Sequence, residues 1–122
     1  MATVDQLQAV LGVLKLAERL KFELRHSYTS SGRQESVAEH TWRMSLMAVL
    51  MEPHLEQQVD MAKLLKMIIV HDLIEAEAGD MSALDVLRYP SLRELKQQRE
   101  VAAIEHLRDQ LGEPLGQQIY EL

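Results

Sequence analysis

The chain has 122 residues, a hydrophobic fraction of 47%, a formal net charge of −6 and no cysteine. This length suits one domain, and the hydrophobic fraction excludes an acidic disordered tail. The lack of cysteine excludes a disulfide framework, a cysteine-ligated zinc site and a thiol nucleophile. The acidic balance argues against a protein that binds duplex DNA, because such a protein needs a basic face.

No segment of the sequence resembles a targeting signal or a membrane span. The first ten residues include Asp5 and lack the basic start and apolar run of a secretory signal. The longest apolar stretch, Met67–Val70, is far shorter than the ~20 residues of a spanning helix. We therefore expect a cytoplasmic protein that binds neither membranes nor nucleic acid polymers.

The first predicted helix runs from about Val4 to Leu24. Thr3 and Gln6 before and within its first turn form a capping box, in which each side chain bonds the other residue's backbone N–H. The turn-forming residues from Ser27 to Gly32 then predict a loop.

A second capping box, of Ser36 and Glu39, predicts a helix from near Val37 to near Met51. Asp60 is suited to cap a third helix, which we expect to stop around Gly79. A shorter helical piece is expected after Ser82.

A longer helix is expected from about Ser91 to Leu111, and Gly112 and Pro114 mark its end. Another helix begins from Leu115. No stretch of useful length alternates with a period of two, so the sequence predicts an all-α fold.

Polar side chains lie on the apolar stripes of two predicted helices. The stripe of the third helix continues into Asp72 and Glu75, with His71 beside them, and His40 lies on the stripe of the second helix. Burying an ionised carboxylate without a partner costs several kcal/mol. A divalent metal ion held by His40, His71 and Asp72 explains this placement, because imidazole and carboxylate ligands suit such ions.

Each of these residues also has an interpretation without chemistry. His40 is then a hydrogen-bonded core histidine, and Asp72 pairs with Arg43 on a neighbouring helix. Glu75 belongs to a solvated helix end, and Asp80 caps whatever follows it. Only the combination of these residues favours a metal site.

The combination resembles a known family. The segments Glu35–His40 (ESVAEH), Ile69–Glu75 (IVHDLIE) and Gly79–Asp80 look like the motifs of the HD-domain phosphohydrolases, in particular the branch of bacterial 5′-deoxynucleotidases and their eukaryotic HD-domain relatives. The resemblance covers the chain from about Leu14 onward. It implies an HD-domain helical bundle.

The resemblance also implies roles for individual residues. His40, His71 and Asp72 match the first three metal ligands of the family signature. Glu75 matches the acid that positions or deprotonates the attacking water, and Asp80 matches a second acid at the pocket that contacts the sugar.

Arg25 falls where the nucleotidase branch keeps an arginine for the substrate phosphate, fifteen residues before His40. Without that role it is an ordinary charge at a helix C-terminus, where the helix dipole favours a cation. The nucleotidases place tryptophan after this arginine, whereas this chain has His26.

The family's fourth metal ligand is an aspartate on a later helix. After Asp80 this sequence has only Asp85 and Asp109, and neither falls at the corresponding place. We therefore expect residues 1–122 to form a single HD domain that lacks its last helices.

The resemblance implies a metal-dependent phosphohydrolase acting on a small phosphomonoester, with a 5′-deoxynucleoside monophosphate as the leading substrate. The implied cofactor is a divalent metal ion, with Mn²⁺, Co²⁺, Fe²⁺, Zn²⁺ and Mg²⁺ all open, and the implied assembly is a homodimer. The alternative is a non-catalytic helical dimerising module with a vestigial metal site. A two-iron oxidase is disfavoured, because only His106 lies in the interval where such relatives carry an extra histidine pair.

Overall fold

The computed structural model describes residues 1–78 and 83–122. Its elements in chain order are α1 (Val4–Ala17), the 3₁₀ turn η1 (Glu18–Lys21), β1 (Leu24–Tyr28), β2 (Gln34–Ser36), α2 (Val37–Met51), the 3₁₀ turn η2 (Glu52–His54), α3 (Met61–Ala78), α4 (Ala83–Arg88), α5 (Pro90–Leu111) and α6 (Leu115–Tyr120). The helical fold class is confirmed. One small antiparallel hairpin, β1–β2, accompanies the helices.

Local capping signals set the helix starts that the sequence predicts. The Thr3 hydroxyl accepts the backbone N–H of Gln6 at 3.1 Å, and the Gln6 side chain accepts that of Thr3 at 2.8 Å. Ser36 and Glu39 make the same reciprocal pair at the start of α2, at 3.2 and 2.9 Å. Asp60 accepts a backbone N–H in the first turn of α3. These caps satisfy N–H groups that have no partner within their own helix.

The predicted end of the first helix is wrong. Helix α1 stops at Ala17, and after η1 the chain enters strand β1, which includes the first two residues of the expected loop. The rest of that loop, from Thr29 to Gly32, lies in the turn between β1 and β2, as predicted. Leu20 in η1 packs against Val37, and the N–H of Val37 donates to the carbonyl of Glu23 at 2.8 Å. These contacts and the pairing with β2 end the helix here. They join residues that are distant in the sequence, so apolar spacing does not reveal them.

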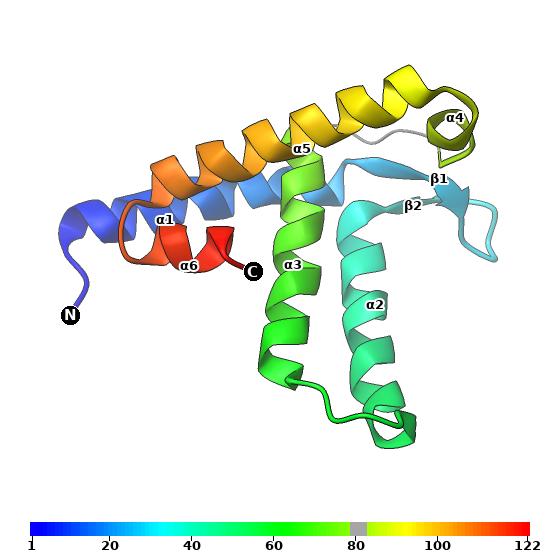
Figure 1. Cartoon of the computed structure of the whole chain (residues 1–122), viewed down its shortest axis with the longest axis horizontal. Coiled ribbons are helices and arrows are strands. Elements are labelled where there is room, and N and C mark those ends of the chain that lie inside the picture. Colours follow the sequence, from blue (N-terminus) through cyan, green and yellow to red (C-terminus); the bar gives the residue numbers. More distant parts are fainter. Residues whose placement is uncertain (79–82) are drawn as a thin grey trace.

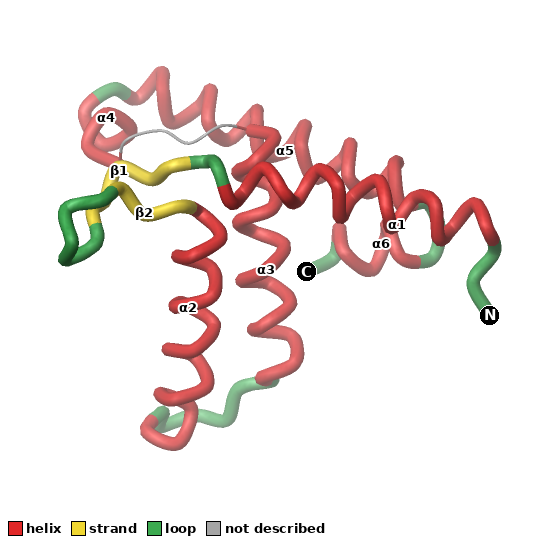
Figure 2. The backbone as a smooth tube through the Cα atoms, turned by 180° about the vertical axis from the view of Figure 1, so that it is seen from behind, coloured by secondary structure: helices red, strands yellow, loops and turns green. Residues whose placement is uncertain are grey.

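The helices form two groups that meet near the hairpin (Figures 1 and 2). Helix α5 packs along α1 and also contacts α3, α4 and α6. Helices α2 and α3 form an antiparallel pair that projects from the α1–α5 layer (Figure 1). The start of α2 and the C-terminal half of α3 therefore lie side by side, and α2 begins directly after strand β2.

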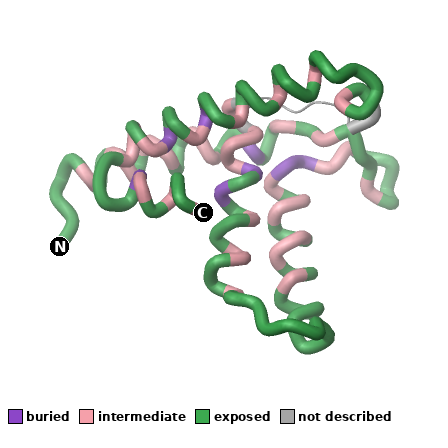
Figure 3. Tube along the Cα trace, viewed as in Figure 1, coloured by how far each residue is buried: buried purple, intermediate pink, exposed green. Residues whose placement is uncertain are grey.

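Buried positions lie where the α2–α3 pair meets the long helices and also along α5 (Figure 3). Among the described residues, the buried hydrophobic ones are Leu20, Val37, Val70, Ala103 and Leu107, and the buried polar ones are Ser36 and Asp72. The side chains of α1 at 4, 7, 11 and 14 are instead more than half exposed. In the parts of the chain that the structure describes, no helix is both long and apolar enough to pass through a membrane.

Helix α6 folds back closely onto the end of α5. Gly112 ends α5 with a φ of +69°, a conformation that glycine adopts readily. A Cβ on Gly116 would lie 2.2 Å from the carbonyl oxygen of Arg108, so only glycine fits at this contact. The Arg108 guanidinium lies 4.6 Å from the centre of the Tyr120 ring, a cation–π distance.

Candidate active site

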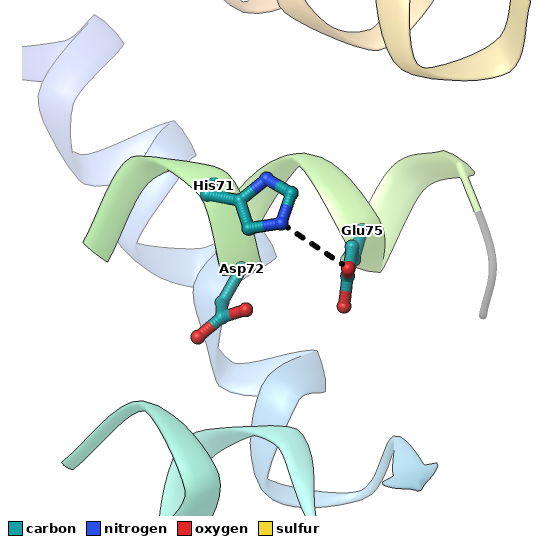
Figure 4. Close-up of side chains that lie close together, drawn as sticks. All are labelled: His71, Asp72 and Glu75. Atoms are coloured by element: carbon teal, nitrogen blue, oxygen red, sulfur yellow. Dashed lines mark ion pairs between the residues drawn. The ribbon is translucent and has the colours of Figure 1, made fainter. Parts of the chain in front are cut away.

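Helix α3 brings together the three site residues that the sequence predicts on it. His71, Asp72 and Glu75 each offer a ligand atom within 4.8 Å of the others (Figure 4). His71 Nε2 lies 3.5 Å from Glu75 Oε1, one helical turn away. Asp72 is buried, Glu75 is half-buried and His71 is exposed, so the cluster extends from the interior to the surface.

The Asp72 carboxylate is held by a residue of the neighbouring helix. Its side chain is 2% exposed, and its Oδ2 atom accepts a hydrogen bond from the Thr41 hydroxyl of α2. The same hydroxyl lies 2.9 Å from the carbonyl of Val37, but it has one proton to donate. The alternative in which Asp72 pairs with Arg43 is wrong, because Arg43 is exposed and Thr41 is the partner.

His40 lies one residue before Thr41, in the first turns of α2. Its side chain is 26% exposed, and its Nδ1 atom is 3.6 Å from Glu35 Oε1. His40 is not part of the group of ligand atoms that the described α3 residues form within 4.8 Å. Because Thr41 touches Asp72, however, this turn of α2 lies directly beside the cluster.

Arg25 lies on strand β1, so its interpretation as a charge at a helix C-terminus is wrong. The hairpin register pairs Leu24 with Ser36, which sets Arg25 beside Glu35 of β2. The Arg25 guanidinium donates to Glu35 Oε1 at 2.8 Å, with side-chain exposures of 31% and 15%. A charge-assisted bond of this length between partly buried groups is among the stronger polar contacts in proteins.

Asp80 lies outside the described residues. Just before it in the sequence, Glu77 of α3 and His106 of α5 are joined through Oε1 and Nδ1 at 2.7 Å. This contact ties the C-terminal end of α3 to α5.

The surroundings of the Glu39 carboxyl lower its pKa. A hydrogen bond from the Arg33 side chain, followed by one from the Ser36 backbone, lowers the Glu39 pKa below its ordinary value of 4.5. Glu39 is exposed and belongs to the helix cap rather than to the α3 cluster. It is therefore a structural carboxylate, in contrast to the buried Asp72.

The donor set of the cluster fits a divalent metal ion. One imidazole nitrogen and two carboxylate oxygens converge on one face of α3, and the most buried of them is a carboxylate. Nitrogen and oxygen donors of this kind suit first-row divalent ions. The buried Asp72 carboxylate accepts one hydrogen bond, from the Thr41 hydroxyl. A bound cation would further offset the free-energy cost of burying this carboxylate.

A groove of about 580 Å³ adjoins the cluster at His71. Apart from His71, its wall is mostly apolar side chains of α2, α3, α5 and α6, with Gln97 and Glu100 of α5 among the polar ones. The volume falls in the range of pockets that bind small molecules.

Sequence reasoning did not single out Thr41 and Glu35 as functional residues. Thr41 directly follows His40, and Glu35 opens the ESVAEH segment, but neither residue has a distinctive spacing of its own. Their partners come from another helix and another strand. A search for polar residues within and directly after the ESVAEH motif would have found both.

Comparison with known proteins places the chain in a family. Residues 17–122 match the family described as HD domain. The chain is 31% identical over 117 residues to 5′-deoxynucleotidase HDDC2 of Xenopus laevis, covering 94% of this chain and 55% of that protein. It is 28% identical over 110 residues to 5′-deoxynucleotidase YBR242W of Saccharomyces cerevisiae, covering 88% and 43%.

A solved structure shares the fold. The crystal structure of a predicted metal-dependent phosphohydrolase from Magnetospirillum magnetotacticum MS-1 matches with a TM-score of 0.80 and 25% identity. The match covers 96% of this chain and 58% of that protein. The chain thus spans about half the length of the curated relatives it matches.

Proposed function

This chain belongs to the HD-domain family, and we propose that it is a metal-dependent phosphohydrolase acting on a small phosphomonoester. The observation that carries the proposal is the convergence of His71, Asp72 and Glu75 beside the turn of α2 that bears His40. Similarity to proteins named 5′-deoxynucleotidases supports a 5′-deoxynucleoside monophosphate as the substrate.

In this proposal, His40, His71 and Asp72 hold a divalent metal ion. When bound, such an ion lowers the pKa of a coordinated water toward ~7 and neutralises charge on a phosphoryl oxygen. Thr41 occupies Asp72 Oδ2 and so leaves the other carboxylate oxygen for the metal.

The remaining residues act on the water and the substrate. Glu75 lies one turn beyond His71, at a distance that allows it to orient the attacking water or accept its proton. Arg25 offers the substrate phosphate the donors of its planar fork that Glu35 does not use. Asp80 is proposed, from the family resemblance, as the acid that contacts the sugar.

The test combines metal binding and phosphate release. The chain is loaded with Mn²⁺ or Co²⁺ and assayed for phosphate release from a panel of deoxynucleoside 5′-monophosphates. Asp72→Ala is expected to abolish both metal binding and turnover. Asp109→Ala is the matched control, because the Asp109 side chain is 72% exposed and Asp109 is not one of the residues of the cluster. Equal activity of the Asp72 and Asp109 variants would show that the enzymatic proposal is wrong.

The second candidate is the non-catalytic helical dimerising module. The exposed apolar side chains of α1 at 4, 7, 11 and 14 favour it, because they form an uncovered stripe on one face of that helix. A chain that dimerises and binds no metal would support this candidate. A homodimer is compatible with either function, so sedimentation alone does not choose between them.

A further inference from the structure

One carboxylate lies between two of the residues proposed for the site. Glu35 Oε1 accepts the Arg25 guanidinium at 2.8 Å and lies 3.6 Å from His40 Nδ1. The Glu35 side chain is only 15% exposed, so water screens these interactions less than at the surface.

The hairpin and the helix cap fix where this carboxylate lies. Glu35 is the middle residue of β2, next to the Leu24–Ser36 strand pair, and Ser36 is the N-cap of α2. The Gln34 side chain donates to the carbonyl of Arg25 at 3.3 Å, a further contact between the two strands. The backbone on both sides of Glu35 is therefore held before its side chain makes any contact.

Arg25 then fixes the direction of the Glu35 side chain. A guanidinium donates in a rigid planar fork, so the 2.8 Å bond restrains the carboxylate oxygen that faces His40. A carboxylate oxygen facing Nδ1 favours the form of the imidazole that carries its proton on Nδ1. A neutral imidazole with its proton on Nδ1 presents Nε2 as its free lone pair.

We propose that Glu35 is a positioning residue that holds His40 with Nδ1 toward the hairpin and thereby leaves Nε2 as the metal-binding atom. Arg25 anchors Glu35, so a residue proposed to bind phosphate also orients a residue proposed to bind metal. Metal-binding histidines commonly use their second nitrogen in this way, and removing the partner typically weakens metal binding 10–100-fold. This inference rests on the proposed function only for the metal-binding role of His40.

The test compares two identical substitutions on neighbouring carboxylates. Glu35→Gln keeps the length of the side chain and removes its charge. Glu39→Gln is the matched control, because Glu39 is exposed, pairs with Arg33, and glutamine retains an oxygen for the helix cap. We expect Glu35→Gln to weaken Mn²⁺ binding about tenfold or more, while the control binds Mn²⁺ as the unsubstituted chain does. Equal Mn²⁺ affinities for the two variants would overturn the inference.

A second measurement separates positioning from a simple effect of charge. Nitrogen-15 NMR of the imidazoles reports which ring nitrogen carries the proton and needs neither metal nor turnover. The Nδ1–H form of His40 is expected to dominate in the unsubstituted chain and to lose population in Glu35→Gln. A dominant Nε2–H form in the unsubstituted chain overturns the inference, even where Glu35→Gln fails to fold.

The inference and the proposed function fail in different ways. A chain that binds Mn²⁺ and responds to Glu35→Gln, but hydrolyses no phosphomonoester, refutes the function and leaves the role of Glu35 in place. A chain that hydrolyses substrate with unchanged Mn²⁺ affinity in Glu35→Gln refutes only the role of Glu35. An unsubstituted chain that binds no Mn²⁺ refutes both.

Discussion

The hydrogen bond from Thr41 to Asp72 makes a quantitative prediction about stability. Thr41→Val replaces the hydroxyl with a methyl group of similar size, so packing is retained while Asp72, 2% exposed, loses this donor. A hydrogen bond to a charged group contributes about 1.5–3 kcal/mol, and an unsatisfied buried charge costs at least as much. We therefore expect the free energy of unfolding to fall by about 2 kcal/mol.

The assay is urea unfolding in the presence of a chelator, so that metal binding does not compensate the carboxylate. With a urea dependence of about 1–3 kcal/mol per molar for a small domain, the loss corresponds to a midpoint lower by roughly 1 M. Thr41→Ser keeps the hydroxyl and is expected to lose less. Ser45→Ala is a second control, because the Ser45 hydroxyl donates to a backbone carbonyl at 2.8 Å rather than to a carboxylate.

The reasoning is refuted if Thr41→Val has the midpoint of Thr41→Ser, because the hydroxyl would then contribute nothing to Asp72. It is also refuted if Ser45→Ala loses as much as Thr41→Val. That result would mean that removing any hydroxyl from α2 has the same effect, with no special role for the buried charge.

Three further predictions concern the phosphate, the helix cap and the α5–α6 contact. Arg25→Ala is expected to raise KM for a deoxynucleoside monophosphate about 10–100-fold, the loss of one charge-assisted bond, whereas Arg33→Ala leaves KM unchanged. The lowered Glu39 pKa stabilises the fold at and above pH 4.5, and this stabilisation is lost as the pH falls through the lowered pKa; Glu39→Gln should therefore flatten the acid side of a plot of urea midpoint against pH. Gly116→Ala is expected to destabilise the chain by about 1–3 kcal/mol in urea unfolding, because its Cβ would meet the Arg108 carbonyl at 2.2 Å; an unchanged midpoint would contradict this.

The helices were largely predictable because their boundaries depend on neighbouring residues. The capping box of Ser36 and Glu39 satisfies backbone groups within three residues, and the observed α2 begins directly after it. Pro53 follows the last turn and prevents the helix from continuing far. Such local signals need no knowledge of the rest of the fold.

The hairpin was not predictable from the same signals. The sequence of strand β1, Leu-Arg-His-Ser-Tyr, has no alternation of apolar and polar residues. Four of its five residues are exposed. Its backbone is stabilised by β2, which follows after a turn closed by a hydrogen bond between Thr29 and Arg33. The prediction of a helix to Leu24 followed apolar spacing past the point where tertiary contacts determine the backbone.

The candidate site divides in the same way. The grouping of His71, Asp72 and Glu75 follows from helical spacing alone, because residues three and four apart lie on one face. The contact of Thr41 with Asp72 depends on how α2 packs on α3, and that of Arg25 with Glu35 depends on the register of the hairpin. Sequence patterns reveal neither the packing of α2 on α3 nor the register of the hairpin directly.

The two halves of the site also differ in how far apart along the chain their contacts lie. Arg25, Glu35 and His40 belong to one continuous segment, and the Arg25–Glu35 contact closes a loop of only 10 residues. The contact between Thr41 and Asp72 joins positions 31 residues apart. Short loops close at a smaller entropy cost and form early in folding. We therefore expect the contact between Arg25 and Glu35 to form earlier in folding than the contact between α2 and α3, so that the second half of the site joins a first half whose local contacts form more readily.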